Sequence, residues 1–190
     1  MLTKMGVTQS LAHHIVAARW GDIPPQVRHQ AKRSLINFFA VTLAGCRSRP
    51  IEIALRSLTE FSGGRPVAVI GRSEHIDALS AAFLNAASAN VDDFCDTQTA
   101  TVIHPTAPVA GALWSCAGLR QVSGSDFLLA LVLGNEVQAR IALAMSPSHY
   151  NRGWHITSTC GVFGAAAACG KLSGLSEDQM LWALGLAATQ

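Results

Sequence analysis

The sequence predicts an all-α fold, a multi-helix packed bundle that forms one domain. Apolar residues recur at three- and four-residue spacing along most of the 190-residue chain, which is the pattern of one buried helix face. Helix-start signals, either Pro or a Ser followed three residues later by Asp or Gln, precede several of these segments. One run, residues 66–71, is β-branched and bounded by Pro and Gly, which predicts a short extended connection or a small hairpin.

Four helices are predicted in the N-terminal half. They run from Ser10 to Trp20, from Pro24-Pro25 to Gly45, from Pro50 to Ser62 and from Ile76 to Asn90. A Pro pair suits a helix start, where a missing N–H has no cost, and Gly suits a helix end. The fourth helix is dense in Ala, so we expect it to be a central, well-buried element.

Four further helices are predicted in the C-terminal half. They run from Ala107 to Leu119, from Asp126 to Met145, from Thr157 to Leu172 and from Ser176 to the end of the chain, with a loop at residues 146–153. The last helix reaches Gln190 without a polar tail, whereas chain ends usually fray. No internal repeat or linker is visible. We therefore expect residues 1–190 to be one partial domain from the N-terminal part of a longer protein.

The composition excludes several classes of partner. Charged residues make up 14% of the chain, against a usual share of about 25%, so part of the surface is expected to be covered by missing sequence or by a partner subunit. No block of Lys or Arg indicates nucleic-acid binding. No apolar run reaches the ~20 residues of a membrane span.

The cysteines and the N-terminus indicate a cytoplasmic protein. Five cysteines form no CxxC pair, and an odd count argues against a disulfide framework. Reduced thiols fit the cytosol, where Cys160 and Cys169 would be small core residues. Residues 1–6 lack the apolar run of a secretory signal.

An acidic segment is the first candidate site. Asp92, Asp93, Asp96 and His104 fall within 13 positions of a chain that is otherwise poor in charge. A solvated acidic turn is the simplest interpretation, but a cluster of carboxylates with an imidazole is also typical of a site that moves protons.

A second candidate site surrounds His155, which lies in Gly153-Trp154-His155-Ile156-Thr157 just before an Ala- and Gly-rich helix. The free N–H groups and the partial positive charge of a helix start favour a substrate carboxylate. Gly161 and Gly164 would let a ligand or another backbone come close. Glu136 and Arg140 are four residues apart, so we expect a structural ion pair.

A divalent metal site is an alternative use of the same groups. The possible ligands are Asp92, Asp93, Asp96, His104 and His155. No HxH, HExxH or similar spacing supports this alternative, so we expect no metal and no other cofactor.

Several segments together resemble the MmgE/PrpD family, which includes 2-methylcitrate dehydratases and cis-aconitate decarboxylases. They are Ile36–Gly45, Ala89–Thr97 with the sequence ANVDDFCDT, His104-Pro105-Thr106, Leu133–Val137 with Arg140, the segment around His155, and Leu172–Ala188. Two departures are Cys95, where many members carry Asp, and an extra residue between Thr97 and His104. The resemblance implies a large helical domain that is interrupted in the sequence by a smaller α+β domain. This chain would hold less than half of a full member, and the smaller domain would be absent from it.

The resemblance also implies a homodimer that acts without metal on a small polycarboxylate. It maps active-site positions of the family onto Asp93, Thr97, His104 and His155. We expect His104, His155 and Asp93 to be catalytic, and Thr97 and Asp96 to bind the substrate. Histidine is the natural base near neutral pH. The expected reaction is dehydration of the 2-methylcitrate type. A cis-aconitate-type decarboxylase, an epimerase and an inactive fragment that serves as a dimerisation module stay open as alternatives.

Overall fold

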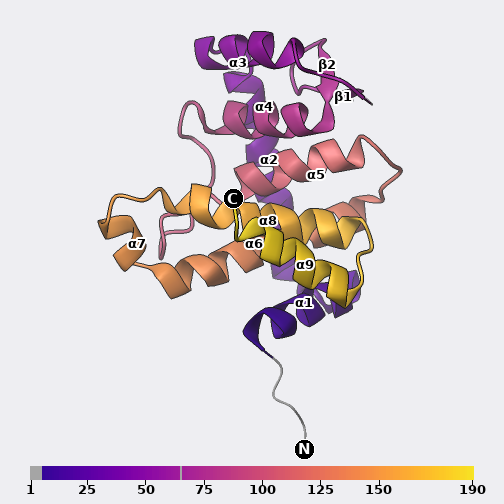
Figure 1. The fold of residues 1–190 in the computed structure, drawn as a ribbon, viewed down its shortest axis with the longest axis vertical. Coiled ribbons are helices and arrows are strands. Elements are labelled where there is room, and N and C mark those ends of the chain that lie inside the picture. The colour runs from indigo at the N-terminus through magenta and orange to yellow at the C-terminus, as the bar shows by residue number, and fades with distance from the viewer. Residues whose placement is uncertain (1–5, 65) are drawn as a thin grey trace, which may run out of the picture.

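The computed structural model describes residues 6–64 and 66–190, and Figure 1 shows a packed bundle of helices. The helices are α1 (Val7–Ala17), α2 (Pro25–Gly45), α3 (Arg49–Thr59), α4 (Ala78–Asn90), α5 (Thr106–Ala117), α6 (Gly124–Met145), α7 (Ser148–Asn151), α8 (Ile156–Leu172) and α9 (Glu177–Ala187). A short 3-10 turn, Trp20–Asp22, follows α1. The predicted all-α class is confirmed. Residues 1–5 lie outside the described residues. They make up most of the N-terminal segment for which no secretory signal was predicted.

The run predicted as a short extended connection or hairpin forms an antiparallel hairpin. Strand β1 (Pro66–Ala68) pairs with β2 (His75–Asp77), with Val67 opposite Ile76. The fourth predicted helix therefore begins two residues later than expected, because Ile76 belongs to β2. Asp77 caps α4 by accepting hydrogen bonds from the backbone N–H groups of Leu79 and Ser80.

Other helix ends differ from the prediction for local reasons. The first helix ends at Ala17, because the chain turns into the 3-10 segment that contains Trp20. The predicted loop at residues 146–153 contains the one-turn helix α7. The last helix ends at Ala187 instead of Gln190. The predicted capping box between Ser176 and Gln179 is confirmed.

The centre of the bundle is the crossing of α6 and α8, beside α5 (Figure 1). Two glycines allow this close approach. A Cβ on Gly134 would lie 2.7 Å from the carbonyl oxygen of Gly164, and a Cβ on Gly164 would lie 2.9 Å from the carbonyl oxygen of Gly134. Gly164 was expected to let a ligand or another backbone come close, and in this structure the backbone of α6 does so. Gly161 faces Pro108 of α5.

Helix α6 is long and apolar enough to cross a membrane by length and composition alone. It packs in this structure as a core helix. Leu129, Leu133 and Val137 are buried against α1, α8 and α9, and Leu131 is buried against α5 and α8. Core helices of soluble proteins meet the same criterion, so α6 is weak evidence for a membrane span.

Polar contacts join elements that are distant in the chain. Lys171 of α8 donates hydrogen bonds to the carbonyl oxygens of Val16 and Ala18, 2.8 and 2.7 Å away, at the C-terminal end of α1. The predicted ion pair is confirmed, since Arg140 Nε donates to Glu136 Oε1 over 2.9 Å. All five cysteines are free in this structure.

Candidate active site

The loop between α4 and α5 carries the acidic segment. Its second half is fixed by Ile103, which is fully buried against Ala142 of α6 and Ile156 of α8. The backbone N–H of Gln98 donates to the carbonyl oxygen of Ile103 over 2.9 Å, so residues 98–103 form a tight turn. The residue after this buried anchor is His104, which is thereby held at the N-terminal end of α8.

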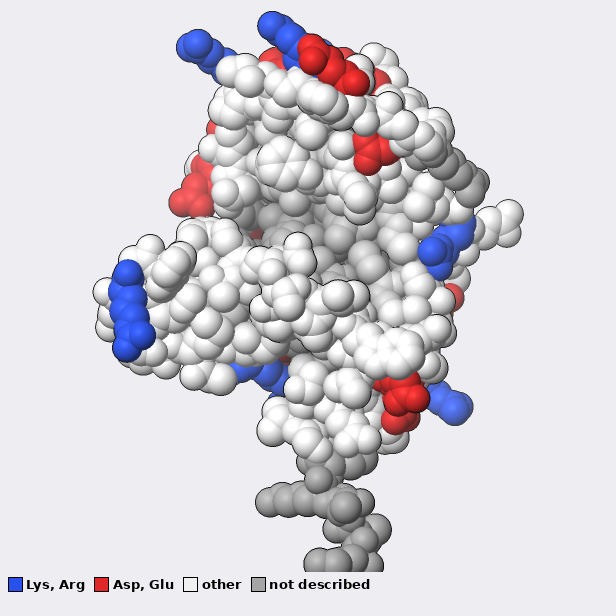
Figure 2. Space-filling model, viewed as in Figure 1, with Lys and Arg blue, Asp and Glu red and all other residues white. Residues whose placement is uncertain are grey.

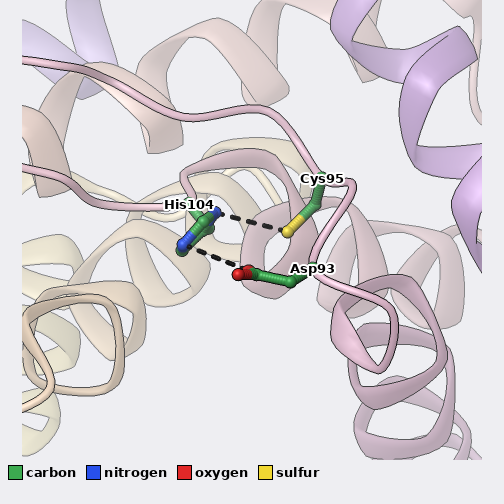
Figure 3. Close-up of side chains that lie close together, drawn as sticks. All are labelled: Asp93, Cys95 and His104. Carbon is green, nitrogen blue, oxygen red and sulfur yellow. Dashed lines mark hydrogen bonds and ion pairs between the residues drawn. The ribbon is translucent and has the colours of Figure 1, made fainter.

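His104 contacts three side chains of its own loop. Its Nε2 lies 3.6 Å from Oδ1 of Asp93, while its Nδ1 lies 3.4 Å from Sγ of Cys95 and 3.2 Å from Oγ1 of Thr97. Figure 3 shows Asp93 and Cys95 on one side of the ring of His104. The side chain of His104 is 18% exposed and that of Asp93 is 77% exposed. The structure therefore brings together three of the predicted site residues, Asp93, Thr97 and His104.

Cys95 is the least accessible member of this group, with 7% of its surface exposed. Asn90 Nδ2 donates to its sulfur over 3.4 Å. Burial raises the pKa of the Cys95 thiol, so the neutral thiol is favoured and an unassisted nucleophilic role is disfavoured.

His155 is exposed and forms the N-cap of α8. Its Nδ1 accepts a hydrogen bond from the backbone N–H of Ser158 over 3.3 Å, and it lies 2.9 Å from Oγ of the same serine. An Nδ1 that accepts this bond carries no proton, so the neutral ring has its N–H at Nε2. That N–H remains available to a ligand.

The two histidines line one groove of about 360 Å³ between α4, α5 and α8. Its lining residues are Phe83, Ala86, Ala87, Asn90, His104, Ala107, Pro108, His155, Thr157, Ser158, Gly161 and Val162. None of them is Lys or Arg. The face in Figure 2 likewise carries only scattered basic side chains near its margins and no basic patch. The groove thus offers imidazoles and helix N–H groups, but its described lining supplies no fixed positive charge for a polycarboxylate.

Asp96 faces α5 instead of the groove. Its two carboxylate oxygens accept hydrogen bonds from Thr106, from the backbone N–H over 3.2 Å and from the hydroxyl over 2.6 Å. Asp96 therefore holds the start of α5 in this structure. Both of the oxygens that the predicted substrate-binding role would use already accept hydrogen bonds from Thr106. Thr97 is exposed, and its hydroxyl contacts His104.

The start of α5 is held from a second side by α6. Asn135 Nδ2 donates to Oγ1 of Thr106 over 3.0 Å, and Gln138 Nε2 donates to the carbonyl oxygen of Pro105 over 2.6 Å. The network fixes the backbone that follows His104. Gln138 is fully buried, so its amide belongs to the supporting structure of the site.

The family is decided by a comparison over nearly the whole chain. The family model of the MmgE/PrpD N-terminal domain matches residues 9–190. The chain belongs to the MmgE/PrpD family. The predicted resemblance is thereby confirmed.

The curated relatives of this MmgE/PrpD chain are longer proteins. It is 32% identical to the cis-aconitate decarboxylase-like protein oryM of Aspergillus oryzae, over 97% of this chain and 40% of the relative. It is 30% identical to the cis-aconitate decarboxylase of Aspergillus terreus, over 98% and 39%, and 28% identical to that of Homo sapiens, over 96% and 39%. The MmgE/PrpD chain thus spans about two fifths of the length of these relatives.

Sequence reasoning missed several supporting residues of this MmgE/PrpD site. The hydroxyl of Thr157, which holds the backbone of His104, and the amides of Asn135 and Gln138 were not predicted as site residues. An amide within an otherwise apolar helix was the available signal for Gln138, because such a side chain needs a buried partner. Thr157 gave no signal, since its partner is 53 residues away in the sequence.

Proposed function

We propose that the full-length protein is a lyase that acts next to a carboxylate of a small polycarboxylate, with His104 and His155 as its proton-transfer and carboxylate-binding groups. The observation that carries this proposal is the shared groove, because two imidazoles from distant parts of the chain line one cavity. A pair of imidazoles can divide the roles of general acid and general base.

The environments of the two histidines support different roles. Nε2 of His104 lies 3.6 Å from the carboxylate of Asp93, and the side chain of His104 is only 18% exposed. His155 is exposed and caps the N-terminal end of a 17-residue helix. There the helix dipole and free N–H groups favour an anion. We therefore assign proton transfer to His104, and carboxylate binding with hydrogen-bond donation to His155.

Decarboxylation of cis-aconitate is the reaction that we place first. The support is the naming of the relatives above, which are called cis-aconitate decarboxylases or a protein like them. In this reaction the bond to the departing carboxyl group breaks, CO₂ leaves, and the electron pair remains on carbon. That carbon then takes a proton from His104, and the charge that develops before protonation is stabilised by donors at the start of α8.

Dehydration of 2-methylcitrate, the reaction expected from the sequence, uses the same groups in another order. A histidine would take the proton next to the carboxylate, and hydroxide would leave with a proton from the second histidine. The positive charge that a polycarboxylate needs is absent from the described lining of the groove, so we propose that other residues of the full-length protein supply it. A second copy of the chain remains the proposed partner, which light scattering on the purified full-length protein would test.

One assay tests the reaction and the residues together. The full-length protein is incubated with cis-aconitate or 2-methylcitrate, and CO₂ release and water loss are followed by mass spectrometry. We expect His104→Gln and His155→Asn to lower turnover about 100-fold or more, while His29→Gln on the exposed side of α2 leaves it unchanged. Full turnover by both site variants would refute the proposal. Turnover on 2-methylcitrate alone would favour the dehydratase.

A further inference from the structure

We propose that Asp93, Cys95 and His104 form a Zn²⁺-binding site, and that zinc bound there inhibits the enzyme by occupying His104. The three side chains come from one loop, and one ligating atom of each lies within 4.8 Å of the others. Figure 3 shows Asp93 and Cys95 both close to the ring of His104, each next to a different ring nitrogen. The inhibitory consequence rests on the proposed function, whereas the binding site does not.

The donor atoms select zinc among the divalent cations. A thiolate, an imidazole and a carboxylate form a mixed set of soft, intermediate and hard donors, which suits Zn²⁺. Mg²⁺ and Ca²⁺ prefer oxygen ligands alone. Three protein ligands leave the fourth tetrahedral position to water, and the exposed carboxylate of Asp93 provides an open side from which an ion can enter.

The distances require a small closure of the loop. Zinc bonds of about 2.0–2.3 Å place neighbouring ligand atoms about 3.3–3.8 Å apart in a tetrahedron. Cys95 Sγ and His104 Nδ1 already lie 3.4 Å apart. Asp93 is the ligand that must move, because its carboxylate lies 3.6 Å from Nε2, the other nitrogen of the ring, and its side chain is 77% exposed. Thr97, also exposed, would give up its contact with Nδ1.

The charge of the loop is a separate argument for a cation. Residues 90–106 contain Asp92, Asp93 and Asp96 but no Lys or Arg. Within the part of the chain that the structure describes, the only ion pair that these three carboxylates form is the one between Asp93 and His104. On binding, the sulfur–hydrogen bond of Cys95 breaks, a sulfur–zinc bond forms, and the proton is released to the buffer. The resulting thiolate and the Asp93 carboxylate together balance the charge of Zn²⁺.

Binding is tested directly on the full-length protein, without substrate. Zinc is titrated against a chromophoric chelator, with Mg²⁺ as a second probe. We expect one Zn²⁺ per chain at a dissociation constant of about 1 µM or below, and no Mg²⁺ binding. We expect Cys95→Ala and Asp93→Asn to weaken zinc binding at least about tenfold. Cys116→Ser, which changes a half-buried thiol on α5, should bind like the wild type.

Two outcomes would overturn the site. One is the absence of zinc binding at micromolar concentrations, and the other is binding that neither Cys95→Ala nor Asp93→Asn weakens. Asp93 is exposed, so its variant is expected to fold even if loss of the buried thiol of Cys95 disturbs the loop. Circular dichroism of each variant verifies the helical content.

Inhibition is tested in the turnover assay. Zinc should abolish turnover of the wild type, a chelator should restore it, and Cys95→Ala should keep its own turnover at the same zinc concentration. Equal inhibition of Cys95→Ala would overturn the inhibitory role. If the enzyme turns over none of the substrates tested, the proposed function fails while the binding titration still decides the site.

Discussion

The backbone N–H of His104 donates to Oγ1 of Thr157 over 3.0 Å, and this bond joins the acidic loop to the first turn of α8. Thr157→Val keeps the shape of the side chain but removes the acceptor. We expect the free energy of unfolding to fall by about 1–3 kcal/mol and kcat to fall about 10–100-fold, because His104 loses its fixed position. Denaturant unfolding and turnover measure the two effects. Thr157→Ser keeps the hydroxyl and should behave like the wild type; if Ser and Val behave alike, the bond does not position His104.

Asp96→Asn separates a structural role at the start of α5 from a substrate-binding role. The carboxylate accepts two hydrogen bonds from Thr106, and an amide can replace only one of the two acceptor oxygens. We expect the free energy of unfolding to fall by about 1–2 kcal/mol. We expect KM to change by less than about threefold, because a residue that does not touch the substrate should leave its binding nearly unchanged. A large rise in KM with unchanged stability would support the substrate-binding role predicted from the sequence.

Gly164→Ala should disturb the central helix crossing. The added methyl group would lie 2.9 Å from the carbonyl oxygen of Gly134, which is backbone and cannot turn aside. We expect a loss of about 1–3 kcal/mol or more in the free energy of unfolding. Gly185→Ala on α9 is the matched control, since a Cβ there meets nothing within 4 Å, and it should raise stability by up to about 1 kcal/mol. Equal effects of the two variants would mean that α6 and α8 are not in close contact.

Acid should weaken the hairpin end of the bundle through Glu74. Arg72, with 4% of its side chain exposed, bonds to Glu52 and Glu74, and its hydrogen bond lowers the pKa of Glu74 to about 2. A carboxylate with a lowered pKa stabilises the fold above its unfolded pKa of about 4.3. This contribution is lost as the pH falls towards 2.

The measurement is the unfolding midpoint between about pH 4.5 and pH 2. Glu74→Gln should flatten its pH dependence, because the variant takes up no proton at this position. Glu60→Gln, which changes an exposed carboxylate next to α3, should leave the dependence of the wild type unchanged. An identical slope for Glu74→Gln and the wild type would show that Glu74 has no altered pKa in the folded protein.

The sequence by itself determined the helices and the candidate residues. Apolar periodicity and capping residues are local signals, so α2 and the capping box at Ser176 were predicted correctly. The order and spacing of the motifs determined the family, and the acidic segment with His155 marked where charge and imidazole are concentrated. Helix ends were less certain, because a neighbouring strand or 3-10 turn decides them, as at Ile76.

Only the tertiary structure decided what each of these side chains does. Contacts between residues far apart in the chain carry no local signal, so neither the groove shared by His104 and His155 nor the bond to Thr157 could be read from spacing. The same is true of Asp96, whose neighbours in the sequence suggest the site while its oxygens bond to α5. A side chain's role depends on the direction in which the packed backbone points it, and long-range packing alone determines that direction.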